Sequence, residues 1–456
     1  MPRRQLSVGG RIGYATGVYG VFIAWMTVAL YLLYFYTDVL GLSPAAAGLV
    51  FFIASMWDAV SDPLMGWLIE KTRSRWGKYR PYLLIAAIPF AAGFAALFYV
   101  PDLTGRSLFV WALVMHIVFR TFYTAIYIPY TGLIARLSSD ADERASIAGI
   151  KGVFISLASL SVSFLALPAV TYLGGEDEAR GFLRVALIGA CIAVAALWIC
   201  FAVTREKQVA GTAPVRPPAP LQAVRALGAN RAFLLIFVGV LLFTGCYTIL
   251  NKSIVYVFKY DLGDRDAARW ALSAIALAGI VSPSIWIPFT HWTGKKTTWI
   301  VGCLLASAGL LFIHFGQIRD IVPLIVVLFI AGCGIHAFLM TFYAMVADAA
   351  DYGEWQSGHR IEAPLFGLVS FANKTSLAFG TWALAGMLDG VGFVPNAEQS
   401  EATLRGMREI MAVVPVAGFL ASALVIAFFP FDTKQHRQFV EEIGARRSAD
   451  DNTVEA

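Results

Sequence analysis

Two aspartates interrupt an apolar segment of the chain, FFIASMWDAVSDPLMGWLIE at 51–70. Asp58 and Asp62 are four residues apart, so a helix would place both carboxylates on one face. Pro63, next to them, cannot donate a backbone hydrogen bond and leaves a carbonyl one turn earlier without its usual partner. A charge at the centre of a membrane-spanning helix costs about 2.5–3.5 kcal/mol, so this pair points to a function.

Oxygen atoms in this arrangement could bind either of two cations. Carboxylates, a free carbonyl and a hydroxyl such as that of Ser61 or Thr124 suit a hard cation, which favours Na⁺ held by Asp58 and Asp62. Two neighbouring carboxylates could equally share a proton, because like charges at short range oppose the ionisation of both. The sequence leaves Na⁺ and H⁺ open. It also leaves open that Asp62 ends the helix and pairs with a basic residue of the following loop.

A second polar face is predicted in HIVFRTFYTAIYIPYTG at 116–132, where His116, Arg120, Thr124 and Tyr127 recur at helical spacing. Arg120 is near the middle of its span and requires an anion, which is either Asp58 or a bound substrate. His116 is expected to be a hydrogen-bonded packing residue rather than a proton relay.

Two lysines also occur within apolar segments. Lys374, in SFANKTSLAFG at 370–380, is about ten residues inside its span, which disfavours extension of its ammonium group to the membrane surface. It is the natural counter-charge for an empty dicarboxylate site. Lys252 is nearer the end of its span, so its side chain is expected to extend to the membrane surface.

The helices that must position these residues are membrane-spanning. Of the 456 residues, 58% are hydrophobic and 14% are charged, compared with about 25% charged residues in soluble domains. The apolar residues run in blocks of about 20, the length that crosses a bilayer. We therefore predict an all-α membrane protein. Its spans, about twelve, are expected near 12–37, 45–70, 81–100, 107–136, 146–173, 181–204, 232–259, 266–290, 297–317, 321–346, 364–388 and 408–430.

The charges of the connecting segments predict the orientation. Lys and Arg gather at the N-terminus and in every second connection, whereas the other connections are short or acidic, as at 37–38 and 176–178. Basic connections face the cytoplasm, so both termini are predicted to be cytoplasmic. These connections account for the net charge of +5, which therefore does not indicate nucleic-acid binding. The basic N-terminus leads into a long first span without a small-residue cleavage site, so no removable signal peptide is expected.

The chain divides at 205–231, a connection rich in Pro and Ala that is typical of a linker. The predicted domains are a six-helix bundle at 1–204, the linker at 205–231, a second six-helix bundle at 232–430 and a cytoplasmic tail at 431–456. Such halves are typical of transporters with a substrate site near the membrane midplane. The five cysteines lack the spacing of a metal site, and no HExxH, GxSxG or P-loop motif indicates an enzyme. No cofactor is expected beyond a co-transported cation.

Several segments, in order, resemble the glycoside-pentoside-hexuronide cation symporters, a branch of the major facilitator superfamily typified by melibiose permease. They are YLLYFYTDVLG in the first span, DAVSDPLMGWLIEKTRSRWGKYRP from the second, YTAIYIPYTGL in the fourth, DERASIAGIK after it, and ADAADYGEWQSGHRIEAPLFGLVSFANK around the tenth and eleventh. The resemblance implies the major facilitator fold, in which two six-helix bundles rock and expose a central site to each side in turn.

The resemblance also implies roles for individual residues. Asp58, Asp62 and Thr124 would form the cation-coupling site, Ser61 would tune the choice of cation, and Lys374 would be the charge near that site. Segments 71–80, 136–151 and 347–363 would form a cytoplasmic gate of charge pairs. Its candidate residues are Arg144, Lys151, Asp348, Asp351, Glu354 and Arg360.

The substrate positions depart from the family's pattern. Melibiose permeases have aspartates in the middle of the first and fourth helices, where this chain has Phe22 and Tyr127. They have a tryptophan where it has Thr131, and an arginine where it has Ser55. With two acidic residues lost and Arg120 gained, the cavity is expected to be less negative. We hypothesise that the substrate is anionic, such as a uronide.

The sequence therefore predicts a secondary symporter, coupled to Na⁺ or H⁺, that imports a glycoside, uronide or related small solute by alternating access. The alternative is an uncoupled facilitator or exchanger of the same fold that carries an amphipathic or lipid-like solute, for which Phe22 and Tyr127 would be suitable. Either protein is expected to work as a monomer in the plasma membrane, which is the bacterial inner membrane by resemblance. Its expected partners are the solute, the coupling cation and the lipid bilayer.

Overall fold

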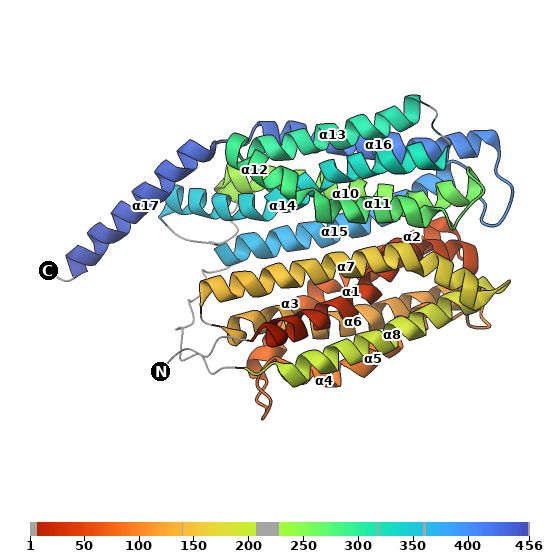
Figure 1. Cartoon of the computed structure of the whole chain (residues 1–456), viewed down its shortest axis with the longest axis horizontal. Coiled ribbons are helices and arrows are strands. Elements are labelled where there is room, and N and C mark those ends of the chain that lie inside the picture. The colour runs from red at the N-terminus through yellow and green to blue at the C-terminus, as the bar shows by residue number, and fades with distance from the viewer. Residues whose placement is uncertain are drawn as a thin grey trace. The chain divides into compact units, whose positions relative to one another are not determined.

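The computed structural model describes residues 7–138, 140–206, 228–316, 318, 320–358 and 362–454, and every regular element in these ranges is a helix (Figure 1). The first half of the chain forms α1 (Val8–Tyr34), the short π-helix η1 (Phe35–Val39), α2 (Pro44–Met56), α3 (Asp58–Lys71), α4 (Arg80–Ile85), α5 (Ala87–Leu97), α6 (Gly105–Leu137), α7 (Ala141–Gly174) and α8 (Glu178–Val203). The second half forms α10 (Arg231–Tyr260), α11 (Ala268–Val281), α12 (Pro283–Thr293), α13 (Lys295–Phe315), α14 (Ile321–Ser357), α15 (Glu362–Gly390), α16 (Glu401–Ala427) and α17 (Thr433–Val454).

The helices coincide with the predicted spans, either singly or in pairs. A single residue separates the members of α2–α3, α4–α5 and α11–α12, so each pair covers one predicted span. In the described part of the chain, nine helices are long and apolar enough to cross a membrane, with α1–η1 and α2–α3 counted once each, and α11–α12, bent by 49°, makes a tenth. The pair α4–α5 and the helix α15 coincide with the two remaining spans. The arrangement is consistent with the twelve membrane spans predicted from the sequence.

Two of the pairs contain a proline whose position has a local consequence. Pro283 begins α12, and because proline has no N–H and its ring clashes with the preceding turn, α11 cannot continue through it. The break between α2 and α3 falls at Trp57, directly before Asp58, and Pro63 follows inside α3. Trp57 keeps a helical conformation, so α2 and α3 form one span that carries Asp58 near its middle.

The chain packs as two compact units. The first unit comprises Met1–Ala213, Asn251–Leu277 and Thr381–Arg408, and the second comprises Pro214–Leu250, Ala278–Gly380 and Glu409–Ala456. The helices α10, α11, α15 and α16 contribute residues to both units. The division into six-helix bundles at 1–204 and 232–430 stays a prediction.

In the first unit, close contacts fix α1 against α8 and α6. A Cβ added at Gly20 would lie 2.8 Å from Ala193 Cα and 2.8 Å from Ala196 Cβ, so the absence of a side chain lets the two helices approach. Tyr14 and Tyr130 each donate a hydroxyl hydrogen bond of 2.9 Å to the backbone carbonyl of the other, and their rings stack 4.4 Å apart. These contacts hold in register α1 and α6, the helices that carry the predicted substrate positions.

In the second unit, α14 packs against α13 and α17. A Cβ at Gly302 in α13 would lie 2.6 Å from the carbonyl oxygen of Gly334 in α14, which again shows close approach of two helices. The segment predicted as a charged tail forms α17, whose Glu442 accepts a hydrogen bond of 2.7 Å from Trp355 Nε1 at the end of α14. The residues of this segment from Thr433 to Val454 are therefore helical (Figure 1).

Candidate cation and substrate site

An ion pair buried between two helices is at the centre of the site. Arg120 in α6 donates from Nη1 to Asp58 Oδ2 at 2.8 Å and from Nη2 to Ser55 Oγ, at the end of α2, at 2.7 Å. The side chains of Arg120 and Asp58 are 6% and 1% exposed. Of the two anions considered for Arg120, Asp58 is the one that the structure shows. Ser55 supplies a second acceptor for the guanidinium of the neighbouring helix.

The remaining oxygen ligands meet one helical turn further along the same two helices. Thr124 in α6 donates from its hydroxyl to Asp62 Oδ1 at 2.9 Å, and the Ser61 hydroxyl donates to Thr124 Oγ1 at 3.4 Å. Asp62 is half-buried, whereas Ser61 and Thr124 are buried. The structure thus brings together four residues expected at the cation site. Lys374 lies in the part of α15 that belongs to the second unit, and its role near the site stays a prediction.

A row of aromatic rings leads away from the ion pair. The guanidinium carbon of Arg120 lies 5.0 Å from the ring centroid of Trp25, which stacks on Tyr123 at 4.6 Å. Tyr123 stacks on Tyr127 at 5.3 Å, and Tyr127 lies 6.0 Å from Phe22. Two of the predicted substrate residues, from α1 and α6, are therefore neighbours in one row.

The last predicted substrate residue, Thr131, makes a local contact. Its hydroxyl donates to the carbonyl of Ile128 in the same helix at 2.9 Å. Lys151 in α7, expected at the cytoplasmic gate, lies instead over rings of α6, with its Nζ 5.6 Å from the Tyr127 centroid and 5.5 Å from that of Tyr130. Lys151 is thus next to the end of the aromatic row.

Lys252 does not extend to the membrane surface, so that expectation is wrong. The residue is 4% exposed, and its Nζ lies 4.4 Å from the centroid of the Phe51 ring. Its helix, α10, is buried on all sides from residue 252 to 258. A lysine at this place in α10 therefore points into protein rather than towards a membrane surface, and only the packing of the helices could show this.

His116 is a packing residue, as predicted, but it lacks the expected hydrogen bond. Its ring is fully buried and makes edge contacts with Phe51 at 4.8 Å and Tyr36 at 6.2 Å between centroids. In the described part of the chain neither ring nitrogen has a hydrogen-bond partner. His116 thus lies one turn of α6 before Arg120, and it contacts the same Phe51 ring as Lys252 does.

The other candidates for the gate lie in both units. In the second unit, Asp348 accepts from Lys295 Nζ at 2.7 Å, and Asp351 lies 3.1 Å from Nε2 of His436 in α17. Glu354, also in α14, is 8% exposed. In the first unit, Arg144 donates to the carbonyl of Ser138 at 3.4 Å. Arg360 lies outside the described residues.

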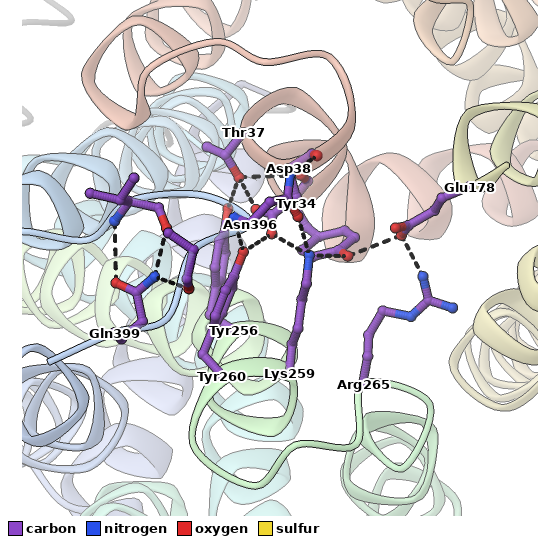
Figure 2. A network of polar contacts seen from close by, with 12 residues as sticks. Tyr34, Thr37, Asp38, Glu178, Tyr256, Lys259, Tyr260, Arg265, Asn396 and Gln399 are labelled. Atoms are coloured by element: carbon purple, nitrogen blue, oxygen red, sulfur yellow. Dashed lines mark hydrogen bonds and ion pairs between the residues drawn. The ribbon is translucent and has the colours of Figure 1, made fainter. Parts of the chain in front are cut away.

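A polar network that the sequence did not predict is centred on Asp38, at the end of α1 opposite the N-terminus (Figure 2). The Asp38 side chain is fully buried and accepts from Lys259 Nζ at 2.6 Å, from Thr37 Oγ1 at 2.7 Å and from the Tyr260 hydroxyl. Asn396 donates to the Asp38 carbonyl at 2.6 Å. We call these five residues the Asp38 network. Within the first unit it joins η1 to α10 and to the connection before α16.

Two further residues, Tyr34 and Glu178, extend this network towards α8. Tyr34 accepts from Lys259 at 3.0 Å and donates to Glu178 Oε1 at 3.0 Å, and Glu178 also pairs with Arg265 in the connection after α10 (Figure 2). Burial alone would lower the pKa of Arg265, but the carboxylates of Glu178 and Asp266 raise it above its ordinary value. Arg265 therefore stays charged at any pH at which the protein is handled. Of these residues, the sequence signalled only Glu178, as an acidic residue of the short connection at 176–178.

Comparison with known proteins places this chain in a family. The family described as MFS/sugar transport protein matches residues 13–433. The isoprimeverose transporter of Lactiplantibacillus pentosus is 34% identical over 433 residues, with 92% of this chain and 88% of the relative covered. The glucuronide carrier protein homolog of Escherichia coli (strain K12) is 28% identical over 454 residues, with 99% and 98% covered.

Solved structures share the fold. The crystal structure of a bacterial homologue of the human lysosomal transporter Spinster has a TM-score of 0.69 at 15% identity, with 95% of this chain and 98% of that chain covered. The helical fold, the family match over most of the chain and the similarity to these relatives all indicate the same class of protein. The chain belongs to the MFS/sugar transport protein family and is a membrane transporter of the major facilitator superfamily, not an enzyme.

Proposed function

We propose that this protein is a secondary symporter that couples the import of a glycoside, uronide or related small solute to Na⁺ or H⁺. The observation that carries the proposal is the buried ion pair of Asp58 and Arg120, one turn from the hydrogen bond of Thr124 to Asp62, inside membrane-spanning helices. Ionisable groups in such helices are costly, and they mark ion and substrate pathways. The names of the isoprimeverose and glucuronide relatives support a sugar-related solute.

The cation would bind to oxygen atoms of α3 and α6. Asp58 and Asp62 supply carboxylates and Thr124 and Ser61 supply hydroxyls, the donors that suit Na⁺, and a proton could occupy the same carboxylates. Lys374 would be the charge that stands in for the cation when the site is empty. In this proposal the cation is a second substrate that crosses the membrane with the solute.

Alternating access would require polar contacts at the two ends of the helices to break in turn. With both termini in the cytoplasm, the Asp38 network would lie at the outer end, because it is at the far end of α1 from the N-terminus. The pairs of Asp348 with Lys295 and of Asp351 with His436 would then lie at the cytoplasmic end. Arg144, Lys151, Glu354 and Arg360 are the remaining gate candidates there.

One observation favours a second candidate, an uncoupled facilitator for an amphipathic solute. The row from Trp25 through Tyr123 and Tyr127 to Phe22 is aromatic throughout, and the resemblance implies aspartates at two of its positions, those of Phe22 and Tyr127. Such a wall suits a solute with a large apolar face. The facilitator would use the carboxylates only to hold Arg120 in place.

Reconstitution into vesicles separates these two candidates. We expect accumulation of labelled methyl β-D-glucuronide or methyl β-D-glucoside to follow an imposed Na⁺ or H⁺ gradient. The Asp58→Asn variant should lose concentrative uptake but retain exchange of internal for external solute. Asp389→Asn, which changes an exposed carboxylate, is the matched control and should behave like the wild type. Uptake that ignores both gradients would support the facilitator.

A further inference from the structure

Lys252 is a buried lysine, and no counter-charge for its amino group is found in the described part of the chain. The residue is 4% exposed, and no hydrogen-bond partner for its Nζ occurs among the described residues. Its contact is with the face of the Phe51 ring, at 4.4 Å. A cation–π contact stabilises an ammonium group only in small part, whereas burial of an unpaired ammonium is strongly unfavourable. Lys252 is therefore poised to receive an anion.

Lys252 of α10 and Arg120 of α6 both contact α2, at positions four residues apart. In α2, Phe51 is beneath Lys252, and Ser55, four residues later, binds Arg120. In α6, His116 meets Phe51 edge-on at 4.8 Å and precedes Arg120 by four residues. One helical turn rises about 5.4 Å, so the positions on α2 that the two side chains contact are about one turn apart, and like charges on the two side chains repel each other. An anion between them would be attracted by both.

We propose that Lys252 and Arg120 together form the subsite for an anionic group of the substrate, a carboxylate or sulfonate, and that Lys252 selects acidic over neutral sugars. The inference rests on the proposed function, because it names the class of solute that the transporter carries. Trp25 lies beside Arg120 and begins the aromatic row. A sugar whose anionic group is held by the two cations could thus lay its apolar face on that row.

The same geometry makes the binding of anion and cation mutually dependent. Arg120 donates to Asp58 at 2.8 Å, so a substrate anion competes with Asp58 for the guanidinium. A cation at Asp58 competes in turn with Arg120 for the carboxylate. When the anion binds Arg120, the Asp58 carboxylate becomes available to the cation, and when the cation binds Asp58, the Arg120 guanidinium becomes available to the anion. Each ligand must therefore raise the affinity for the other by the same factor. This dependence is what symport of an anion with a cation requires.

The test is binding to the purified full-length protein of three matched probes. They are methyl β-D-glucuronide, its analogue with a sulfonate in place of the carboxylate, and neutral methyl β-D-glucoside. Affinities are measured by calorimetry for the wild type, Lys252→Met and Lys252→Arg, with Lys434→Gln as the control for an exposed lysine. Because Met removes an unpaired buried charge and keeps the side-chain volume, Lys252→Met is expected to fold with unchanged or higher thermal stability.

We expect the wild type to bind at least one acidic probe about tenfold or more tightly than the glucoside, as one charge-assisted contact implies. Lys252→Met should bind the acidic probe about tenfold more weakly than the wild type and bind the glucoside with unchanged affinity. Lys252→Arg should keep most of the affinity for the acidic probe. Comparison of the two acidic probes shows which oxyanion fits. Wild-type protein that binds neither acid more tightly than the glucoside, or Lys252→Met with unchanged discrimination, would overturn the inference.

Uptake into vesicles separates a failure of this inference from a failure of the proposed function. If binding of an acidic probe depends on Lys252 but its accumulation ignores Na⁺ and H⁺ gradients, the subsite stands and symport is wrong. If accumulation follows a gradient but the Lys252 variants carry acidic and neutral probes as the wild type does, symport stands and the anion subsite is wrong.

Discussion

Arg120 is the residue on which the charges of the site depend, because it binds Asp58 and Ser55 while lying over Trp25. In the Arg120→Gln variant the buried Asp58 carboxylate loses its guanidinium partner. Removal of one member of a buried pair costs about 3–5 kcal/mol, so we expect a clearly lower thermal unfolding temperature in detergent.

The matched control at this scale removes both charges. The double variant Arg120→Gln/Asp58→Asn leaves neither member of the pair charged, and it should recover a large part of the lost thermal stability. A double variant whose loss equals the sum of the two single losses would show that the two groups are not energetically coupled. Unfolding followed by intrinsic fluorescence gives all four values of this cycle.

At the scale of the elements, close packing of α1 on α8 positions Phe22 and Trp25. The Gly20→Leu variant would place its Cβ 2.8 Å from the backbone of Ala193, so α1 must move or α8 must bend. Overpacking of this kind costs about 1–3 kcal/mol, and we expect a lower unfolding temperature together with weaker solute binding, because the aromatic row would shift.

Gly9→Ala is the control for this element, since no atom lies within 4 Å of a Cβ at that position in the first turns of α1. It should leave unfolding temperature and binding unchanged. Normal stability of Gly20→Leu would show that α1 and α8 do not need the observed approach.

At the scale of the whole molecule, the Asp38 network ties segments far apart in the chain to one another within the first unit. Lys259 joins Asp38, Tyr34 and Asn396. We expect Asp38→Asn and Lys259→Gln each to lower the unfolding temperature, and the double variant to lose less than the sum, because contacting charges couple by about 0.5–3 kcal/mol. Lys434 is an exposed lysine, and its Gln variant is the control. In the double variant Asp38→Asn/Lys434→Gln, the decrease in unfolding temperature should equal the sum of the decreases in the two single variants.

The same variants test the role of this network in transport. If its contacts break and reform in each cycle, weakening them changes the rate of uptake more than the affinity for the solute, because the solute does not touch them. We therefore expect Asp38→Asn to alter the maximal rate of counterflow by several-fold at an unchanged half-saturating concentration. An unchanged rate with lower thermal stability would assign the network to stability alone.

The sequence by itself determined the class of protein, the positions of its helices and the residues that share a helical face. Runs of apolar residues and the period of 3.6 are local properties, so Asp58 could be grouped with Asp62, and Arg120 with Thr124, before any packing was known. The resemblance to cation symporters added the roles of these residues, and the family match confirmed the family.

Only the tertiary structure decided which faces meet. It showed Asp58 as a partner of Arg120, it buried Lys252 against Phe51, and it assembled Asp38, Lys259 and Asn396 from three distant segments. None of these contacts follows from spacing along one helix, because each depends on how separate helices approach and rotate against one another. For a charged residue near the end of an apolar run, the sequence therefore predicts a position at the surface, whereas the packing of neighbouring helices buries the residue.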